Sequence, residues 1–296
     1  MSSWDLGGVQ IDRVLENEAP LLAPDILFPD FDAEVLNAHR DWLEPNLLQP
    51  GTDLLILAFN SYVVRTKHHV ILIDTCTGND KERPQKPRYH MKNWPFLERL
   101  AAAGLSPADI DFVMCTHLHV DHVGWNTQLV NGRWVPTFPN ARYLFTKNEF
   151  EHWQNDEKRA LYTTDPYFED SLLPVIEAGQ ADFVDMDYAF DDTAWLDPTP
   201  GHTPGHVCVH VKGGRGEAVM SGDLMHHAFQ CTMPAWNSCF CVDPTASRAM
   251  RRAFLERHAD TDTLIMPAHF PTPSVGRIRR HGDAFRFAFV EEVVTA

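Results

Sequence analysis

The sequence predicts an α/β (α+β) fold in which two facing β-sheets are flanked by helices. Short apolar runs that are typical of strands alternate along the chain with segments of helical periodicity. The chain has 296 residues, of which 44% are hydrophobic, so it can bury one sizeable core. No internal period of about 20 to 50 residues indicates a repeat architecture. Strand clusters that alternate with helices on a chain of this length favour a layered sandwich.

The first 50 residues are interpreted as an N-terminal extension that packs on the main domain, residues 51–296. A short strand is expected near residues 9–14, and a helix over residues 33–42. Prolines between these two elements interrupt any longer helix. Because the extension is rich in apolar residues, we expect it to cover the mouth of a site or to form a homodimer contact. Simple packing against the sandwich is the alternative.

The segment over residues 54–104 should carry two strands and a helix. Two strand-like runs between residues 54 and 74 are separated by Lys67, His68 and His69, which we expect to form an exposed hairpin turn. An amphipathic helix is predicted over residues 93–103, and Gly104 ends it. The chain then enters a short buried strand over residues 110–115.

The elements after residue 140 follow the same alternation. A strand over residues 142–145 leads into a helix through Trp153, whose start we predict to be a capping box made by Thr146 and Glu149. Further helices are predicted over residues 167–177 and 244–258. The remaining strands are expected to pass through Phe183, Trp195, Val209 and Val219.

Three histidines and an aspartate occupy six consecutive positions after the strand predicted at residues 110–115. They are His117, His119, Asp121 and His122. In an extended segment alternate side chains point the same way, so His117 and His119 can share one ion while Asp121 and His122 turn toward another. Imidazole and carboxylate ligands suit zinc and other borderline first-row metals. A solvated histidine-rich loop is the alternative.

Three further candidate ligands lie downstream, each beside a strand-like run. His202 stands in a turn that prolines and glycines make rigid. Asp223 ends an apolar run, and its two oxygens could bridge two cations, while His269 ends another such run. Taken singly, they could be a turn histidine, a loop cap and a core histidine. Together with the six-residue cluster they indicate a metal centre.

These motifs make the chain resemble, over roughly residues 50 to 285, the metallo-β-lactamase superfamily of dinuclear metallohydrolases. The resemblance implies a four-layer αβ/βα sandwich, with a hydrolase domain at residues 51–296. It assigns His117, His119 and His202 to one metal, assigns Asp121, His122 and His269 to the other, and makes Asp223 the bridge. Asp74 would not be a ligand but would support the metal loop by hydrogen bonding.

The C-terminal third is similar to the branch of this superfamily that contains methyl parathion hydrolase and bacterial lactonases. The similar positions are residues 222–226, Gln230, Pro234, Asp243, the helix around residues 248–254, and the run from His269 to Ile278. Quorum-quenching lactonases of this branch usually carry a tyrosine three residues after the bridging aspartate, where this chain has His226. This departure argues against a preference for acyl-homoserine lactones and leaves the metal chemistry unchanged.

The ligand set and the resemblance together imply a metal-dependent hydrolase that cleaves a lactone or a carboxylic (aryl) ester through a metal-bridging hydroxide. Two divalent ions are expected, with Zn²⁺ first and Mn²⁺, Co²⁺ or Fe²⁺ as alternatives. As catalytic residues we expect Asp121 to orient the hydroxide or accept its proton, and His226 to donate a hydrogen bond to the substrate. The alternative functions are an organophosphate triester hydrolase, a glyoxalase-type thioesterase and a non-catalytic metal-binding protein.

The substrate pocket is expected to have an apolar, aromatic wall, which would suit a small neutral ester or lactone. The residues singled out for it are Trp125, Phe229, Trp236 and Phe270, with Trp134, His227, Met233 and Phe240 as further candidates. Ordinary core packing is the alternative for each aromatic residue.

The composition limits which classes of binding partner and which cellular compartment we expect for this chain. The formal net charge of -16 does not supply the clustered Lys and Arg that phosphate backbones require, so nucleic acid is excluded as a partner. No run resembles a membrane span of about 18 apolar residues or a signal peptide, so no membrane partner is expected. Six irregularly spaced cysteines do not suggest a disulfide framework. We therefore expect a cytoplasmic protein with reduced thiols.

Overall fold

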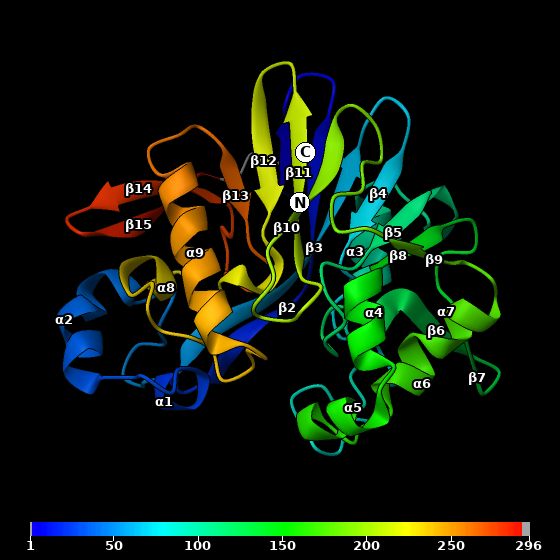
Figure 1. Cartoon of the computed structure of the whole chain (residues 1–296), viewed down its shortest axis with the longest axis horizontal. Coiled ribbons are helices and arrows are strands. Elements are labelled where there is room, and N and C mark those ends of the chain that lie inside the picture. Colours follow the sequence, from blue (N-terminus) through cyan, green and yellow to red (C-terminus); the bar gives the residue numbers. More distant parts are fainter. Residues whose placement is uncertain (1, 292–296) are drawn as a thin grey trace.

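The computed structural model describes residues 2–291 and contains two β-sheets packed face to face, with helices on both outer sides (Figure 1). This arrangement confirms the predicted fold class. The first sheet has the order β1-β2-β3-β4-β5-β8-β9, and the second has the order β10-β11-β12-β13-β14-β15. A small ribbon of β6 (Thr127–Val130) and β7 (Arg133–Pro136) lies apart from them.

The strands of the first sheet are β1 (Ser3–Asp5), β2 (Gln10–Leu22), β3 (Leu55–Arg65), β4 (Val70–Ile73), β5 (Phe112–Met114), β8 (Arg142–Thr146) and β9 (Ala181–Val184). Those of the second sheet are β10 (Ala194–Pro198), β11 (Val207–Gly213), β12 (Gly216–Met220), β13 (Leu264–Met266), β14 (Gly276–His281) and β15 (Ala284–Phe289).

Three apolar layers hold the sandwich together, because successive side chains of a strand face opposite sides of its sheet. Val64 and Ile71 of the first sheet meet Val209 of the second in the central layer. Val63, one residue earlier, faces the helices outside the first sheet. These helices are α3 (Phe96–Ala102), α4 (Lys147–Trp153), α6 (Tyr167–Ser171) and α7 (Leu173–Glu177). The second sheet is covered by α2 (Ala33–Leu43), α8 (Phe229–Thr232) and α9 (Pro244–His258).

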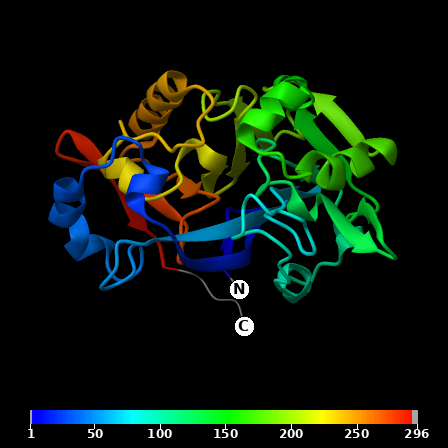
Figure 2. The ribbon, with the colours of Figure 1, turned by 90° about the horizontal axis from the view of Figure 1, so that it is seen from below.

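The N-terminal segment is part of the first sheet and does not merely pack on it. The strand expected near residues 9–14 continues to Leu22 and pairs antiparallel with β3 from Gln10 onward. Figure 2 shows these two strands lying side by side and reaching toward the segment that carries α1 (Pro24–Leu27) and α2. Pro20 is tolerated inside β2 because β1 pairs only with residues 10–12, so the rest of β2 is a sheet edge. No break in the structure therefore falls at residue 50.

Several helix predictions are confirmed, and others are corrected. The helices at residues 33–42 and 244–258 form as predicted, and Gly104, with φ of 74°, follows α3. The helix predicted over residues 167–177 is divided at Leu172, because Pro174, in the first turn of α7, has no backbone N–H to continue the hydrogen bonding of α6. Helix α5 (Asp156–Tyr162) and the β14–β15 hairpin were not predicted.

The predicted capping box at α4 is wrong. Thr146 stands at the N-cap, but its side chain does not cap the helix and donates instead to the carbonyl of Gly205, 2.8 Å away. Glu149 turns into the protein and is 1% exposed. The short 3₁₀ turns are η1 (Pro107–Asp109), η2 (Gly124–Asn126) and η3 (Gly222–Leu224). None of the helices within residues 2–291 combines the length and hydrophobicity needed to cross a bilayer.

Candidate functional site

The predicted metal ligands come together where the two sheets meet, because each lies just beyond a strand. The loop carrying His117 to His122 follows β5, and His202 lies in the turn between β10 and β11. Asp223 follows β12, and His269 follows β13. Strands β12 and β13 run parallel, as do β4 and β5, so their carboxyl ends emerge at shared edges.

Seven side chains form two adjoining groups of potential metal ligands. The first group is His117, His119, His202 and Asp223, and the second is Asp121, His122 and His269. Within each group the ligand atoms lie within 4.8 Å of one another. All seven residues that the sequence nominated as ligands are therefore brought together.

The carboxylate of Asp223 faces both groups, one oxygen to each. Its Oδ2 lies 3.6 Å from Nε2 of His117 and 3.3 Å from Nε2 of His202. Its Oδ1 lies 3.1 Å from Nε2 of His122 and 3.0 Å from Nε2 of His269. Burial by itself raises the pKa of Asp223, but the surrounding imidazoles, His122 and His269 first, hold it well below its usual range.

The donor set fits divalent metal ions. Nε2 of His117 and Nε2 of His119 are buried and make no hydrogen bond, although a buried polar atom without a partner is costly. Burial also lowers the pKa of His117 and His119 well below the usual value, which keeps their imidazoles in the neutral form that binds metals. Imidazole nitrogens and carboxylate oxygens are ligands that zinc takes readily.

Asp74, for which the resemblance implied a supporting role, lies outside the cluster and contacts the loop that carries the candidate ligands. Its Oδ2 lies 2.9 Å from Nδ1 of His122, and its Oδ1 accepts a hydrogen bond from the backbone N–H of Thr116 at 2.7 Å. On the other side of the centre, Nδ1 of His269 lies 3.0 Å from the carbonyl of Ala58. Such contacts fix which ring nitrogen faces the metal.

His206 positions Asp223, a role that the sequence analysis missed. Its Nε2 accepts a hydrogen bond from the backbone N–H of Asp223 at 3.0 Å, and its Nδ1 lies 2.8 Å from the hydroxyl of Thr199. Gly222 has φ of 47°, and a Cβ there would lie 2.7 Å from Nε2 of His206. Glycine is therefore required beside Asp223. The pattern Gly205-His206 close to His202 was the available sequence signal.

Glu149 joins the two histidine loops and was also missed, since the sequence had assigned it to a helix cap. Its Oε1 accepts a hydrogen bond from the backbone N–H of Leu118 at 3.0 Å, and its Oε2 accepts one from Gly205 at 2.8 Å. The indole of Trp153 also donates to Oε1, at 2.6 Å. One buried carboxylate thus holds the loop of His117 and His119 against the loop of His202.

Two tyrosines contact the predicted ligands. The hydroxyl of Tyr89 donates to Oδ2 of Asp121 at 3.1 Å, and the ring of Tyr162 stacks on His119 with a centroid distance of 4.3 Å. Asp121 Oδ2 also lies 3.8 Å from Nε2 of His269. No periodic pattern in the segment over residues 78–95 signalled Tyr89, because this segment forms irregular loop structure.

His226 lies against the metal centre. Its Nε2 is 3.2 Å from Oδ2 of Asp223 and 3.3 Å from the hydroxyl of Ser238, and its Nδ1 is buried without a hydrogen-bond partner. Burial lowers the pKa of His226 to about 4, so the imidazole is neutral near pH 7.

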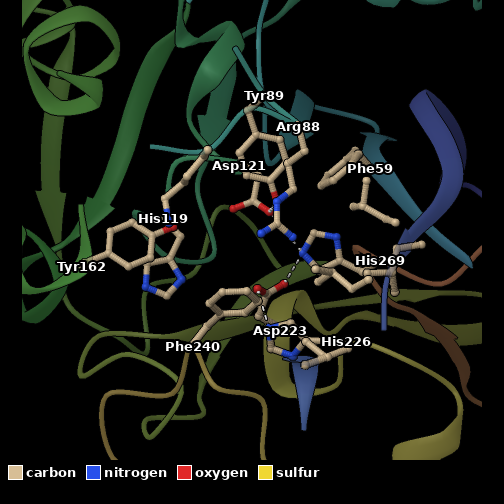
Figure 3. Close-up of a pocket in the computed structure, with 15 residues that line it drawn as sticks. Phe59, Arg88, Tyr89, His119, Asp121, Tyr162, Asp223, His226, Phe240 and His269 are labelled. Carbon is tan, nitrogen blue, oxygen red and sulfur yellow. Dashed lines mark hydrogen bonds and ion pairs between the residues drawn. The ribbon is translucent and has the colours of Figure 1, made fainter. Parts of the chain in front are cut away.

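A cavity opens over the centre, and Figure 3 shows His119, Asp121, Asp223, His226 and His269 facing it. Its apolar wall comes from Leu21, Leu22, Leu27, Leu57, Phe59 and Phe240, and its polar wall includes Lys86, Arg88, Tyr89 and Tyr162. The N-terminal segment therefore contributes to the site. Aromatic rings do line the cavity, but apart from Phe240 they are not the aromatic residues expected from the sequence, and four leucines share the apolar wall with them.

The four aromatic residues singled out for the pocket lie elsewhere in the described structure. Trp125 stacks on Phe96 and donates to the buried carboxylate of Glu16. Phe229, Trp236 and Phe270 belong to the apolar layer outside the second sheet. Of the other aromatic candidates, Phe240 lines the cavity. Periodicity identified these residues as apolar but could not place them.

Comparisons with known proteins identify the family of the chain. Residues 57–269 match the family model of the Metallo-beta-lactamase superfamily. The N-acyl homoserine lactonase AttM of Agrobacterium fabrum is 27% identical over 213 residues, covering 66% of this chain and 75% of that protein. AttM of Azorhizobium caulinodans is 29% identical over 232 residues, covering 71% and 80%.

Solved structures share the fold over nearly the whole chain. The hydrolase AbOPH of the beta lactamase superfamily has a TM-score of 0.81 at 21% identity, covering 98% of this chain and 97% of that one. AidC, a dizinc quorum-quenching lactonase in complex with a product, has a TM-score of 0.78 at 22% identity, covering 99% and 98%.

Proposed function

Because the chain belongs to the metallo-β-lactamase superfamily and is a metal-dependent hydrolase, we propose that it is a dinuclear enzyme that cleaves a lactone or a carboxylic ester. The observation that carries this proposal is the division of the two Asp223 oxygens between two groups of histidines. One ion cannot use seven ligands, whereas two ions that share a carboxylate can. Zinc is the proposed metal, because the donors are imidazole nitrogens and carboxylate oxygens.

Two bound ions would lower the pKa of a shared water and polarise the bond under attack. The residues around them then have separate roles. Asp121 accepts the proton of the attacking water, and the hydrogen bond from Tyr89 orients its carboxylate. His226 faces the cavity beside Asp223 and donates a hydrogen bond to the oxygen that gains charge during the reaction. The leucine wall binds the apolar part of the substrate.

The lactonase relatives support a lactone or ester over a phosphotriester, since AttM proteins are named for lactone hydrolysis. The experiment is a panel of lactones, aryl esters, phosphotriesters and thioesters, assayed after the metal-free protein has been loaded with zinc, manganese or cobalt. We expect a lactone or aryl ester to give the highest kcat/KM. If the kcat/KM of a phosphotriester exceeded that of every lactone and ester by about tenfold, or about 1.4 kcal/mol of transition-state preference, the organophosphate hydrolase hypothesis would replace this proposal.

A further inference from the structure

We propose that Lys86 and Arg88 form a binding site for an anionic group of the substrate, so that the preferred ester or lactone carries an acidic group near its scissile bond. This inference rests on the proposed hydrolase function, and it replaces the neutral substrate that the sequence suggested. Both residues line the cavity over the metal centre, on the segment between β4 and α3. Figure 3 shows the guanidinium of Arg88 extending into the cavity toward Asp121 and His269.

Neither cation has a carboxylate partner among residues 2–291. No side-chain hydrogen bond or ion pair of Lys86 or Arg88 is present in this part of the chain, and Nη1 of Arg88 is buried without any partner. Their side-chain contacts are aromatic: Lys86 Nζ lies 4.3 Å from the centroid of the Tyr162 ring, and Arg88 Cζ lies 5.6 Å from that of Tyr89. Arg83 of the same segment, by contrast, binds Asp170 through both terminal nitrogens, at 2.6 and 2.8 Å.

Lys86 and Arg88 share one cavity, and no ion pair to a carboxylate is present there among the described residues, although acidic residues are abundant in the chain. Acidic residues outnumber basic ones by 41 to 25, so a carboxylate partner is readily available to most cations. The two carboxylates of the cavity, Asp121 and Asp223, already belong to the candidate metal centre. They cannot neutralise Lys86 and Arg88 while they also bind metal ions.

The two cations also repel each other in a partly buried place. Burial lowers the pKa of Lys86, and the nearby charge of Arg88 lowers it further, although Asp121 opposes both effects. The negative charges that act on Lys86 come from Asp121 and Asp165, which lie beyond ion-pair distance. Asp121 belongs to the candidate metal centre, and bound metal ions would add more positive charge near the two cations. A carboxylate or similar anion bound between them would offset this repulsion and could pair with the planar guanidinium through two hydrogen bonds.

The apolar wall of the cavity indicates the chemistry of the remaining part of the substrate. Leu21, Leu22, Leu27 and Leu57 offer only apolar contacts. The cavity therefore has an apolar side and a cationic side, with the metal centre beneath both. This combination fits an amphiphilic ester or lactone that has one hydrocarbon portion and one acidic group.

The first experiment measures binding without turnover. Zinc-loaded protein is titrated calorimetrically with 4-acetamidobenzoate and with 4-acetamidobenzamide, which differ in charge and contain no ester. We expect the carboxylate to bind at least tenfold more tightly, and we expect Arg88→Met and Lys86→Met each to reduce that ratio at unchanged metal content. Arg88→Lys should retain part of it. Lys67→Met, in the exposed turn between β3 and β4, is the matched control and should change nothing.

The second experiment measures kcat/KM for the corresponding esters, 4-acetoxybenzoate and 4-acetoxybenzamide, and for the phenyl monoester of adipic acid and its amide. The first pair carries the charge on the phenol leaving group, and the second pair carries it on the acyl chain. A carboxylate preference that persists in both Met variants would place the anion on the metals and overturn the inference, as would the absence of any preference. If no ester is cleaved but the binding preference depends on Arg88, the anion site stands and the proposed function fails.

Discussion

Oδ2 of Asp74 lies 2.9 Å from Nδ1 of His122, so the carboxylate fixes the ring that directs its Nε2 toward Asp223. Asp74 directly follows β4 in the chain, and its φ of 58° is a left-handed backbone conformation. We predict that Asp74→Asn lowers metal affinity by about 10- to 100-fold while the protein stays folded. Competition with a chelator, followed by elemental analysis, measures the affinity. Asp187→Asn, at an exposed position, should leave it unchanged; equal affinity of Asp74→Asn and wild type would contradict this role.

Replacing Asp223 with Ala should abolish binding of both metals, because the substitution removes the carboxylate that faces both groups. Turnover on the best ester or lactone should fall with the metal content. Elemental analysis after loading with excess zinc provides the measurement, with circular dichroism to verify folding. Retention of two ions per chain in a folded variant would exclude Asp223 as the bridge.

His226→Ala should reduce kcat by about 10²- to 10³-fold while both metals stay bound, if the imidazole donates to the reacting oxygen. Its contact with Asp223 makes the metal measurement essential. His226→Gln, which keeps a donor, should recover part of the loss. Full activity of His226→Ala across the panel would remove His226 from the catalytic machinery.

Glu149→Ala should lower both stability and metal affinity, because it leaves the backbone N–H groups of Leu118 and Gly205 without their acceptor. Each unsatisfied buried donor costs about 1–3 kcal/mol. Urea unfolding of the metal-free protein measures the first effect, and chelator competition measures the second. Glu151→Ala on the exposed face of the same helix is the control. Unchanged metal affinity would restrict Glu149 to a structural role.

The free energy of unfolding should depend on pH through the titration of Lys81. Burial is the main cause that lowers the pKa of Lys81 from 10.5 to about 7. Above pH 7 the folded protein releases a proton that the unfolded chain keeps up to 10.5, so stability rises with pH by as much as about 1.4 kcal/mol per unit. This gain in stability is lost as the pH falls from 10.5 toward 7, and below pH 7 Lys81 is protonated in both states and contributes no further change.

Lys81→Met should flatten this rise, whatever its effect on the absolute stability. Urea unfolding of the metal-free protein at a series of pH values above 7 gives the slope, and Lys67→Met should keep the wild-type slope. Equal slopes in Lys81→Met and wild type would show that Lys81 remains charged in the folded protein.

The metal centre was largely predictable because its signals are local in the sequence. His117, His119, Asp121 and His122 are neighbours in one loop, Asp223 and His269 each follow a strand-like run, and His202 stands in a turn between two such runs. Strand ends that emerge at one edge of a sheet bring such residues together without any detailed knowledge of packing. The resemblance to a known superfamily then supplied the pairing of ligands with metals.

The contacts that support the centre depend on packing between distant segments, and the sequence did not reveal them. Glu149 matched a capping-box pattern, but its carboxylate is drawn inward by donors from two loops that lie 31 and 56 residues away in the sequence. Tyr89, Lys86 and Arg88 belong to an irregular segment, where no periodicity shows which side chains face the cavity.

The sequence by itself determined the layered α/β fold and the seven metal-ligand candidates, because hydrophobic periodicity and short motifs are encoded in neighbouring residues. Only the tertiary structure decided that residues 10–22 pair into the first sheet and that leucines and two cations line the cavity, where Trp125, Phe229, Trp236 and Phe270 had been expected. The physical reason is that an apolar side chain gains nearly the same free energy from burial in a core as in a pocket wall. Its final place is set by long-range strand pairing and packing, which a single sequence does not display.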